Sequence, residues 1–289
     1  MVEYKRRTVL QGIGTIGVLT TVGVGTAAGA DDGEAGLRVA HASPDAPAVD
    51  VLVDGGVAVS GLEFGEVTGY LELEADDYDI AVNVAGTDTT VFSAEDVALA
   101  AEDYTAVALG EVESDDSEFT VSLLEDTNGA NIGDGEARVR AIHASPDAPA
   151  VDVTVNDGAL TVFDGVAFGE SSGYAVVPAG DYEVEIRPDT EDDDGPVVFE
   201  VGGVTLEGGA TYTVFALGYL SPDDEGEDAP EFFLLPTQDA SAPPRGNGDD
   251  EEEEDEEEDE EDDGERGPPD DAGPNGVGRG PPADAGPGN

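Results

Sequence analysis

The sequence contains one stretch of eleven residues twice. Residues 41–51 read HASPDAPAVDV, and residues 143–153 are identical to them. Further tyrosines pair between the copies at nearly the same spacing, namely Tyr70 with Tyr174, Tyr78 with Tyr182, and Tyr104 with Tyr212. A chain of 289 residues has room for about two domains. The duplication therefore predicts two tandem copies of one domain.

Both copies show the period-two alternation of half-buried strands, for example at residues 49–54, 78–84 and 182–187. Similar short runs lie at 71–74, 90–93, 104–109, 119–124, 175–177, 197–201, 212–217 and 232–235. Gly55-Gly56 predicts a hairpin turn, and only 95–102 has a short helical pattern. We predict an all-β fold of two tandem immunoglobulin-like antiparallel β-sandwich domains, at 37–126 and 137–239. The polar linker at 127–136 permits bending and keeps the domains close.

Four tyrosines each begin a predicted strand after an acidic or glycine-bearing turn: Tyr78, Tyr104, Tyr182 and Tyr212. This placement is typical of a tyrosine corner, in which the hydroxyl bonds back to the chain a few residues upstream. A stacking platform for sugars is the alternative interpretation. We favour the corner.

Residues 1–30 have the features of an export signal. Lys5, Arg6 and Arg7 precede an uncharged stretch at 8–30 that ends in Ala28-Gly29-Ala30. The paired arginines resemble a twin-arginine signal, which would export a folded protein. An uncleaved anchor is the alternative, but many glycines and threonines make the stretch poorly apolar. Gly12, Gly14 and Gly17 spell a dinucleotide-binding motif without the strand and the acidic residue that such a site needs.

Residues 240–289 form a predicted disordered tail. Residues 249–263 are all acidic, and 264–289 are mainly Gly, Pro, Asp and Ala. Neither segment can bury enough apolar area to offset the loss of chain entropy. No apolar segment follows, so we expect no stable membrane insertion once the signal is cleaved.

Charge defines the expected environment. The chain has 69 acidic and 10 basic residues and a net charge of −59. Such self-repulsion opposes folding in ordinary salt, whereas molar salt shortens the screening length to about 3 Å. We therefore expect a secreted or cell-surface protein of an extreme halophile, in keeping with an archaeal source. The same charge argues against nucleic acid as a partner, and the absence of cysteine excludes disulfides and thiolate metal sites.

The repeated motif has a structural interpretation and a metal-binding one. Pro44 and Pro47 fix the backbone, so Ser43–Pro47 should form a rigid corner between two strands, with Asp45 accepting backbone N–H groups of that turn. Alternatively, the recurring carboxylates of Asp45, Asp50, Asp147 and Asp152 could hold calcium, which prefers oxygen ligands. No EF-hand loop is present, and so many acidic residues produce close pairs by chance. We expect no cofactor other than this possible calcium.

His41, Ser43 and Asp45 have the residue types of a catalytic triad. Residues two apart on an extended chain lie about 6.6–7 Å apart, whereas a base must come within about 3 Å of its nucleophile. We therefore expect no enzymatic activity. His41 and His143 should instead be hydrogen-bonded strand residues beside the corner.

The paired segments 38–51 and 140–153 resemble the opening of the domain of unknown function 4397 family. Phe64-Gly65 to Tyr70, Phe168-Gly169 to Tyr174, and 179–182 match the rest of the family's pattern, whereas 75–78 departs from it because a glycine is replaced. The resemblance covers roughly residues 37–220. It implies exported or surface-associated β-sandwich modules of bacteria and archaea, with no established activity.

We therefore expect a non-catalytic surface protein of unknown ligand whose sandwich modules contact an envelope protein, a polysaccharide or the matrix. The tail would act as a solvating, cation-attracting brush. The alternative is a calcium- or polysaccharide-binding protein with a defined site in its acidic loops.

Overall fold

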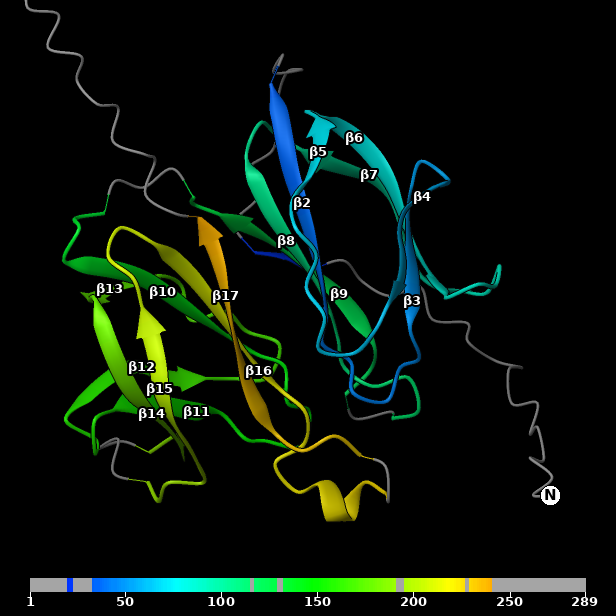
Figure 1. The fold of residues 1–289 in the computed structure, drawn as a ribbon. Helices are drawn as coiled ribbons and strands as arrows, with labels where there is room; N and C mark the ends of the chain where they lie inside the picture. The colour runs from blue at the N-terminus through cyan, green and yellow to red at the C-terminus, as the bar shows by residue number, and fades with distance from the viewer. Residues whose placement is uncertain are drawn as a thin grey trace, which may run out of the picture. The chain divides into compact units, whose positions relative to one another are not determined.

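Figure 1 shows the computed structural model, which describes residues 20–22, 33–114, 117–128, 132–190, 195–226 and 229–240. Strands dominate, with one 3-10 helix, η1 (Pro222–Asp224), in the described residues. No helix in this part of the chain has the length and apolar character needed to cross a membrane.

The first copy, called repeat 1, contains eight strands. They are β2 (Glu34–His41), β3 (Val49–Val53), β4 (Gly56–Leu62), β5 (Leu71–Glu74), β6 (Asp76–Val84), β7 (Thr90–Leu99), β8 (Asp103–Leu109) and β9 (Thr120–Asp126). The second copy, repeat 2, has the equivalent series. Its strands are β10 (Glu136–His143), β11 (Val151–Val155), β12 (Leu160–Val166), β13 (Ala175–Pro178), β14 (Gly180–Pro188), β15 (Phe199–Leu206), β16 (Thr211–Leu217) and β17 (Phe233–Ala240).

Each repeat is a sandwich of two sheets with the same topology. The orders are β9-β8-β2-β5 and β4-β3-β6-β7 in repeat 1, and β17-β16-β10-β13 and β12-β11-β14-β15 in repeat 2. Among these sixteen strands, neighbours are antiparallel, except that β2 pairs in parallel with β8, and β10 with β16. The predicted all-β fold of two tandem sandwiches is thus confirmed. The parallel pairs were not predicted, because alternation shows which face a side chain occupies but not which strand lies beside it.

The two sheets of each repeat enclose an apolar core. In repeat 1 the core includes Leu37, Val51 and Phe92, and in repeat 2 it includes Val151 and Phe163. The alternating residues of each strand supply these side chains, so one face of every sheet faces inward. Burial of this apolar area is the main force that holds each sandwich together.

The local predictions were largely correct. Strand β7 replaces the helical pattern at 95–102, and Asp96 at φ 52° marks an irregularity where the register shifts. The first hairpin turns at Asp54-Gly55, which have φ of 50° and 75°, one residue earlier than predicted. Positive φ at both residues suits a tight hairpin turn.

The tyrosine corners are confirmed. Tyr78 donates its hydroxyl to the Glu74 carbonyl at 2.8 Å, and Tyr182 donates to Pro178 at 2.6 Å. The hydroxyl of Tyr104 instead accepts the Ala100 N–H at 3.2 Å. Tyr212 does the same with the N–H of Glu207 at 3.1 Å. Each bond spans four or five residues and fastens the turn before the strand.

The two repeats share a third apolar core. Val107 and Leu124 of repeat 1 form one buried cluster with Ile142, Phe215 and Leu217 of repeat 2. Consequently, every residue of β2 after Glu34 is buried, because one face of the strand meets its own core and the other meets repeat 2. The linker composition indicated modules that could bend, whereas the structure joins the repeats within one compact unit.

Three residues of the predicted signal segment form β1 (Thr20–Val22), which pairs in parallel with β9. The rest of that segment up to residue 30, and the predicted tail beyond residue 240, lie outside the described residues.

Candidate functional site

His41 and His143 close the corner of each repeated motif. The Nε2 atom of His41 lies 3.1 Å from the Pro47 carbonyl oxygen, and that of His143 lies 2.9 Å from Pro149. A carbonyl can only accept, so Nε2 carries the ring proton in both residues. Burial lowers the pKa of both imidazoles, which keeps them neutral. The predicted structural role of the histidines is confirmed by these contacts.

Ser43 and Asp45 fasten the loop that follows β8. The Ser43 hydroxyl donates to the Gly110 carbonyl at 2.6 Å. The Asp45 carboxylate accepts the N–H of Val112 at 2.9 and 3.0 Å and that of Glu113 at 3.0 Å. The donors were expected within the turn itself, and this was wrong: the motif positions a loop 67 residues away in the sequence, which residue types alone did not indicate. Because Ser43 bonds to a carbonyl, it does not form the hydroxyl–imidazole contact that a triad needs.

The second motif repeats the aspartate part of this arrangement. The Asp147 carboxylate accepts the N–H of Leu220 at 2.8 Å and that of Ser221 at 2.7 Å. The Ser145 hydroxyl donates to Asp147 at 3.2 Å. Identical sequence thus produces the same loop anchor in both repeats.

The other two calcium candidates lie on strands β3 and β11. Asp50 accepts the N–H of Gly61 at 2.8 Å and of Gly86 at 2.9 Å. Asp152 accepts the N–H of Gly165 at 2.9 Å, and its other oxygen accepts that of Thr190 at 3.3 Å. The structure therefore brings Asp45 and Asp147 together at one surface and leaves Asp50 and Asp152 apart from it.

That surface is an acidic groove of about 530 Å³, lined by Asp45, Glu111, Glu113, Ser114, Ser117, Pro146, Asp147, Phe168, Tyr219 and Glu225. Both copies of the motif contribute their aspartate to it. Tyr219 of repeat 2 lines the groove and donates its hydroxyl to Glu111 of repeat 1, also in the lining, at 2.7 Å. Burial raises the pKa of Tyr219, and the bond to Glu111 raises it further. Tyr219 thus remains a proton donor, and its bond links the two repeats at the groove.

A buried network of arginine and aspartate holds the repeats in the arrangement that forms the groove. Arg38 donates from Nε to its neighbour Thr105 at 2.9 Å, and Arg140 donates equivalently to Thr213 at 2.9 Å. Each guanidinium then reaches the opposite repeat. Arg38 pairs with Asp239 at 2.7 Å, and Arg140 pairs with Asp126. All four charged side chains are at most 3% exposed.

Hydroxyl groups also donate to the carboxylates of the network. Thr105 and Tyr70 each donate a hydroxyl to Asp126 at 2.5 Å, and Thr213 donates to Asp239 at 2.6 Å. Burial alone would lower the pKa of Arg38, but the facing acidic groups raise it above its usual value. Burial raises the pKa of Asp239, and Arg38 opposes that shift. The crossed pairs thus link the repeats through buried contacts.

Residues 35–154 and 137–249 each match the family model described as Domain of unknown function (DUF4397). The chain belongs to the DUF4397 family. The two matches correspond to the two sandwiches, and together they cover most of the described residues. No curated protein matches this DUF4397 chain.

Two solved structures are similar to this DUF4397 protein over part of their length. The Bacillus anthracis TIE protein is 12% identical with a TM-score of 0.21, over 64% of this chain and 34% of its own. A leucine-rich repeat protein from Bacteroides thetaiotaomicron VPI-5482 is 12% identical with a TM-score of 0.15, over 60% and 25%. The chain thus spans about a third and a quarter of these proteins, respectively.

A second acidic feature lies on repeat 2. Carboxylate oxygens of Asp152, Asp164 and Asp189 lie within 4.8 Å of one another. Asp152 is buried, whereas the other two are exposed. Of these three residues, only Asp152 was named from the sequence as a candidate calcium ligand. Its partners are distant in the sequence and come together through the β11–β12 hairpin and the end of β14.

Sequence reasoning also missed the crossed arginine–aspartate network and Tyr219. The scarcity of positive charge was an available signal, since Arg38 and Arg140 precede the two motifs at equivalent positions in a chain with 10 basic residues. Nothing in the sequence distinguished their partners Asp126 and Asp239 from the other acidic residues, of which the chain has 69 in all.

Proposed function

We propose that this DUF4397 protein is exported and acts outside the cell as a non-catalytic binding module that holds an envelope component in its acidic groove. The main observation in support is that Asp45 and Asp147, from the two identical motifs, both line the acidic groove of about 530 Å³. A duplicated motif that served folding alone would need no common surface.

Rigidity favours binding at this groove. The loops that line it are fastened by Asp45 and Asp147, and the crossed arginine pairs fix one repeat against the other. A groove that is already ordered loses little conformational entropy when a ligand enters. The groove therefore suits a ligand that fits its existing shape.

The chemistry of the groove limits the class of ligand. In molar salt, charges act over only about 3 Å, so attraction at a distance contributes little. A ligand must instead contact Glu113, Glu225 or their neighbours directly. Ammonium or guanidinium groups of an envelope protein, sugar hydroxyls of a polysaccharide, and bridging divalent cations all meet this requirement.

The proposed location rests on the chain's composition. The basic and then apolar N-terminus is typical of export signals, and the paired Arg6 and Arg7 favour the twin-arginine type. The net charge of −59 fits the salt-rich surroundings of an extreme halophile.

Co-sedimentation of the chain from Asp31 to Asn289 with halophile envelopes, in molar salt, tests the proposal. Glu113→Gln with Glu225→Gln should lower the amount bound at least about tenfold, because both exposed carboxylates line the groove. Glu72→Gln with Glu74→Gln on β5 is the matched control, since it removes the same charge elsewhere. Equal binding by both variants would contradict the groove. Repeating the assay with calcium or with a chelator separates cation bridging from direct contact.

Calcium binding by Asp152, Asp164 and Asp189 is the alternative that a specific observation favours, namely their mutual approach within 4.8 Å. Register places Ser60 and Ala85 of repeat 1 at the positions of Asp164 and Asp189, so this site would bind one ion per chain rather than two. Terbium luminescence in molar sodium chloride should show one equivalent that Asp164→Asn with Asp189→Asn removes. An unchanged signal in that variant assigns the binding to other carboxylates.

A further inference from the structure

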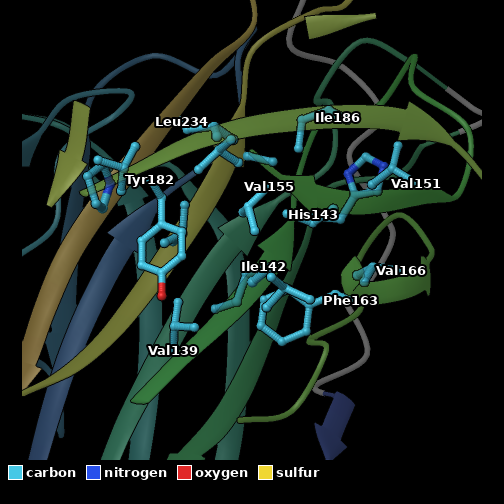
Figure 2. A pocket seen from close by; sticks show the side chains of 18 of the residues that line it. Val139, Ile142, His143, Val151, Val155, Phe163, Val166, Tyr182, Ile186 and Leu234 are labelled. Atoms are coloured by element: carbon cyan, nitrogen blue, oxygen red, sulfur yellow. The ribbon is translucent and has the colours of Figure 1, made fainter. Parts of the chain in front are cut away.

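The two sandwiches differ in how completely their cores are filled. Repeat 2 has an apolar cavity of about 70 Å³ between its sheets, partly open to the surface, whereas the corresponding space in repeat 1 is about 20 Å³. Figure 2 shows the side chains that surround it, among them Val139, Val155, Phe163, Tyr182 and Leu234. The wall exposes no polar atom to the cavity.

Three equivalent core positions carry shorter side chains in repeat 2, whereas Val214 and Leu234 are larger than their counterparts Ala106 and Val121. Val39 and Ala141 occupy the same register position beside β8 and β16, so repeat 2 lacks two methyl groups there. Two residues earlier on the same strand, Val139 likewise replaces Leu37. On the facing sheet, Val184 takes the place of Ile80. These positions cluster around the cavity, so their shortened side chains leave adjoining space.

The walls of the cavity also keep accessible surface that repeat 1 has lost. Ala106 and Val121 are buried at 9% and 5% exposure. Their counterparts in repeat 2, Val214 and Leu234, are only half-buried and line the cavity. The sheets of repeat 2 thus enclose apolar surface that no side chain of the described residues covers.

An apolar cavity of this kind is not suited to water. A buried water needs two to four polar partners, and this wall supplies none. Apolar cavities lined by aliphatic and aromatic side chains stay dry and accept small apolar molecules, as an engineered cavity of about 150 Å³ accepts benzene or xenon. The present cavity is smaller, so it fits an aliphatic group rather than a ring.

We propose that repeat 2 is a binding site for a small aliphatic group, such as the end of an alkyl chain, and that repeat 1 is not. The site is distinct from the acidic groove, because its wall is uncharged and it lies between the sheets of one repeat. It would add a hydrocarbon contact to a module whose surface is otherwise strongly acidic.

Methyl-labelled NMR of the full chain in molar salt, with xenon and n-butane as probes, tests this proposal. Saturable shifts are expected for the methyl groups of Val139, Val184 and Val214, and none for those of Leu37, Val82 and Val121 in repeat 1. Absent shifts, or equal shifts in both repeats, would overturn the proposal.

Filling the cavity gives the decisive variant. Ala141→Val restores the residue of repeat 1, and it should abolish the shifts while raising Tm by about 2–4 °C. Val39→Ala is the matched control, because it should open a cavity in repeat 1, lower Tm and transfer xenon-dependent shifts there. If Ala141→Val disturbs the fold, Val184→Ile fills the same space from the opposite sheet. Retention of the shifts in a folded, cavity-filled variant would refute the assignment.

Binding at the cavity and binding at the acidic groove can be tested separately. Glu113→Gln with Glu225→Gln should leave the xenon shifts unchanged, and Ala141→Val should leave binding at the groove unchanged. Failure of one proposal therefore does not imply failure of the other.

Discussion

At the scale of single residues, positive charge has a structural use throughout the described part of the chain. Arg38 and Arg140 cross between the repeats, Arg138 stacks on Tyr174 at 4.1 Å, and Arg187 pairs with Glu185 at 2.7 Å. No other arginine or lysine lies in this part of the sequence. The few cations in the described residues thus contact buried or half-buried groups, and the surface is left to the carboxylates.

Removing one member of a crossed pair should be costly. Arg140→Ala leaves the buried Asp126 with Arg38 alone, whose Nη2 lies 3.7 Å from Asp126 Oδ2, and we expect a loss of about 3 kcal/mol in the free energy of unfolding. Urea unfolding in molar salt measures the change. The double variant Arg140→Ala with Asp126→Ala should be less destabilised than the sum of the two single variants, because they remove the same interaction. A loss below about 1 kcal/mol in the single variant would show that the pair contributes little.

The buried histidines should make stability depend on pH. Burial lowers the pKa of His143 in the folded state, so the unfolded chain binds more protons. Its stabilising contribution is fully present above the unfolded pKa of about 6.5 and is lost as the pH falls through the lower folded value. His143→Gln keeps a donor for the Pro149 carbonyl and does not titrate. The stability difference between wild type and variant, followed from pH 8 to 4.5, should therefore shift against the wild type on acidification; a constant difference would contradict this account.

At the scale of the elements, the sequence predicted the strands better than their partners. Alternation located β3, β5 and β14 closely, because inward and outward side chains differ in polarity. It did not indicate the parallel pairs or the contact between repeats, because both depend on residues far apart in the chain. The corner was correctly predicted from Pro44 and Pro47, whereas the groove required the position of Asp45 relative to Asp147, which only the tertiary structure defines.

The strand ends beside the groove depend on two equivalent glycines. Gly110 and Gly218 have φ of 86° and 81°, and an added Cβ would lie 2.4 and 2.3 Å from the carbonyl oxygens of Glu118 and Glu231. Gly218→Ala should therefore cost more than the roughly 1–2 kcal/mol of a left-handed backbone alone, as measured by urea unfolding. Gly202→Ala is the control, because its Cβ meets nothing within 4 Å and its strand backbone tolerates alanine. Equal stability of the two variants would contradict the role of Gly218.

At the scale of the whole molecule, three apolar cores and one charged network make the repeats a single structural unit. The middle core contains side chains from both repeats, so neither sandwich can unfold without exposing the other's surface. Self-repulsion among the carboxylates opposes this unit, and salt relieves the repulsion. Stability and cooperativity should therefore respond together to ionic strength.

Lowering the salt from molar to about 0.1 M, where screening extends to about 10 Å, should abolish the near-UV dichroism of the tyrosines. Because the repeats share a core, we expect one transition rather than two. Separate labels in repeat 1 and repeat 2 would give coincident midpoints by fluorescence. Two distinct midpoints would contradict the shared unit, and an unchanged spectrum would contradict the salt requirement.

The crossed pairs have a reciprocal form. Arg38 of repeat 1 pairs with Asp239 of repeat 2, and Arg140 of repeat 2 pairs with Asp126 of repeat 1. Reciprocity of this kind defines an isologous contact, in which one patch binds a second copy of itself about a twofold axis. The chain thus has the construction of a homodimer whose two subunits have been fused into one polypeptide. A DUF4397 protein with a single repeat and the same arginine, threonine and aspartate would accordingly be expected to pair with another molecule of its own kind.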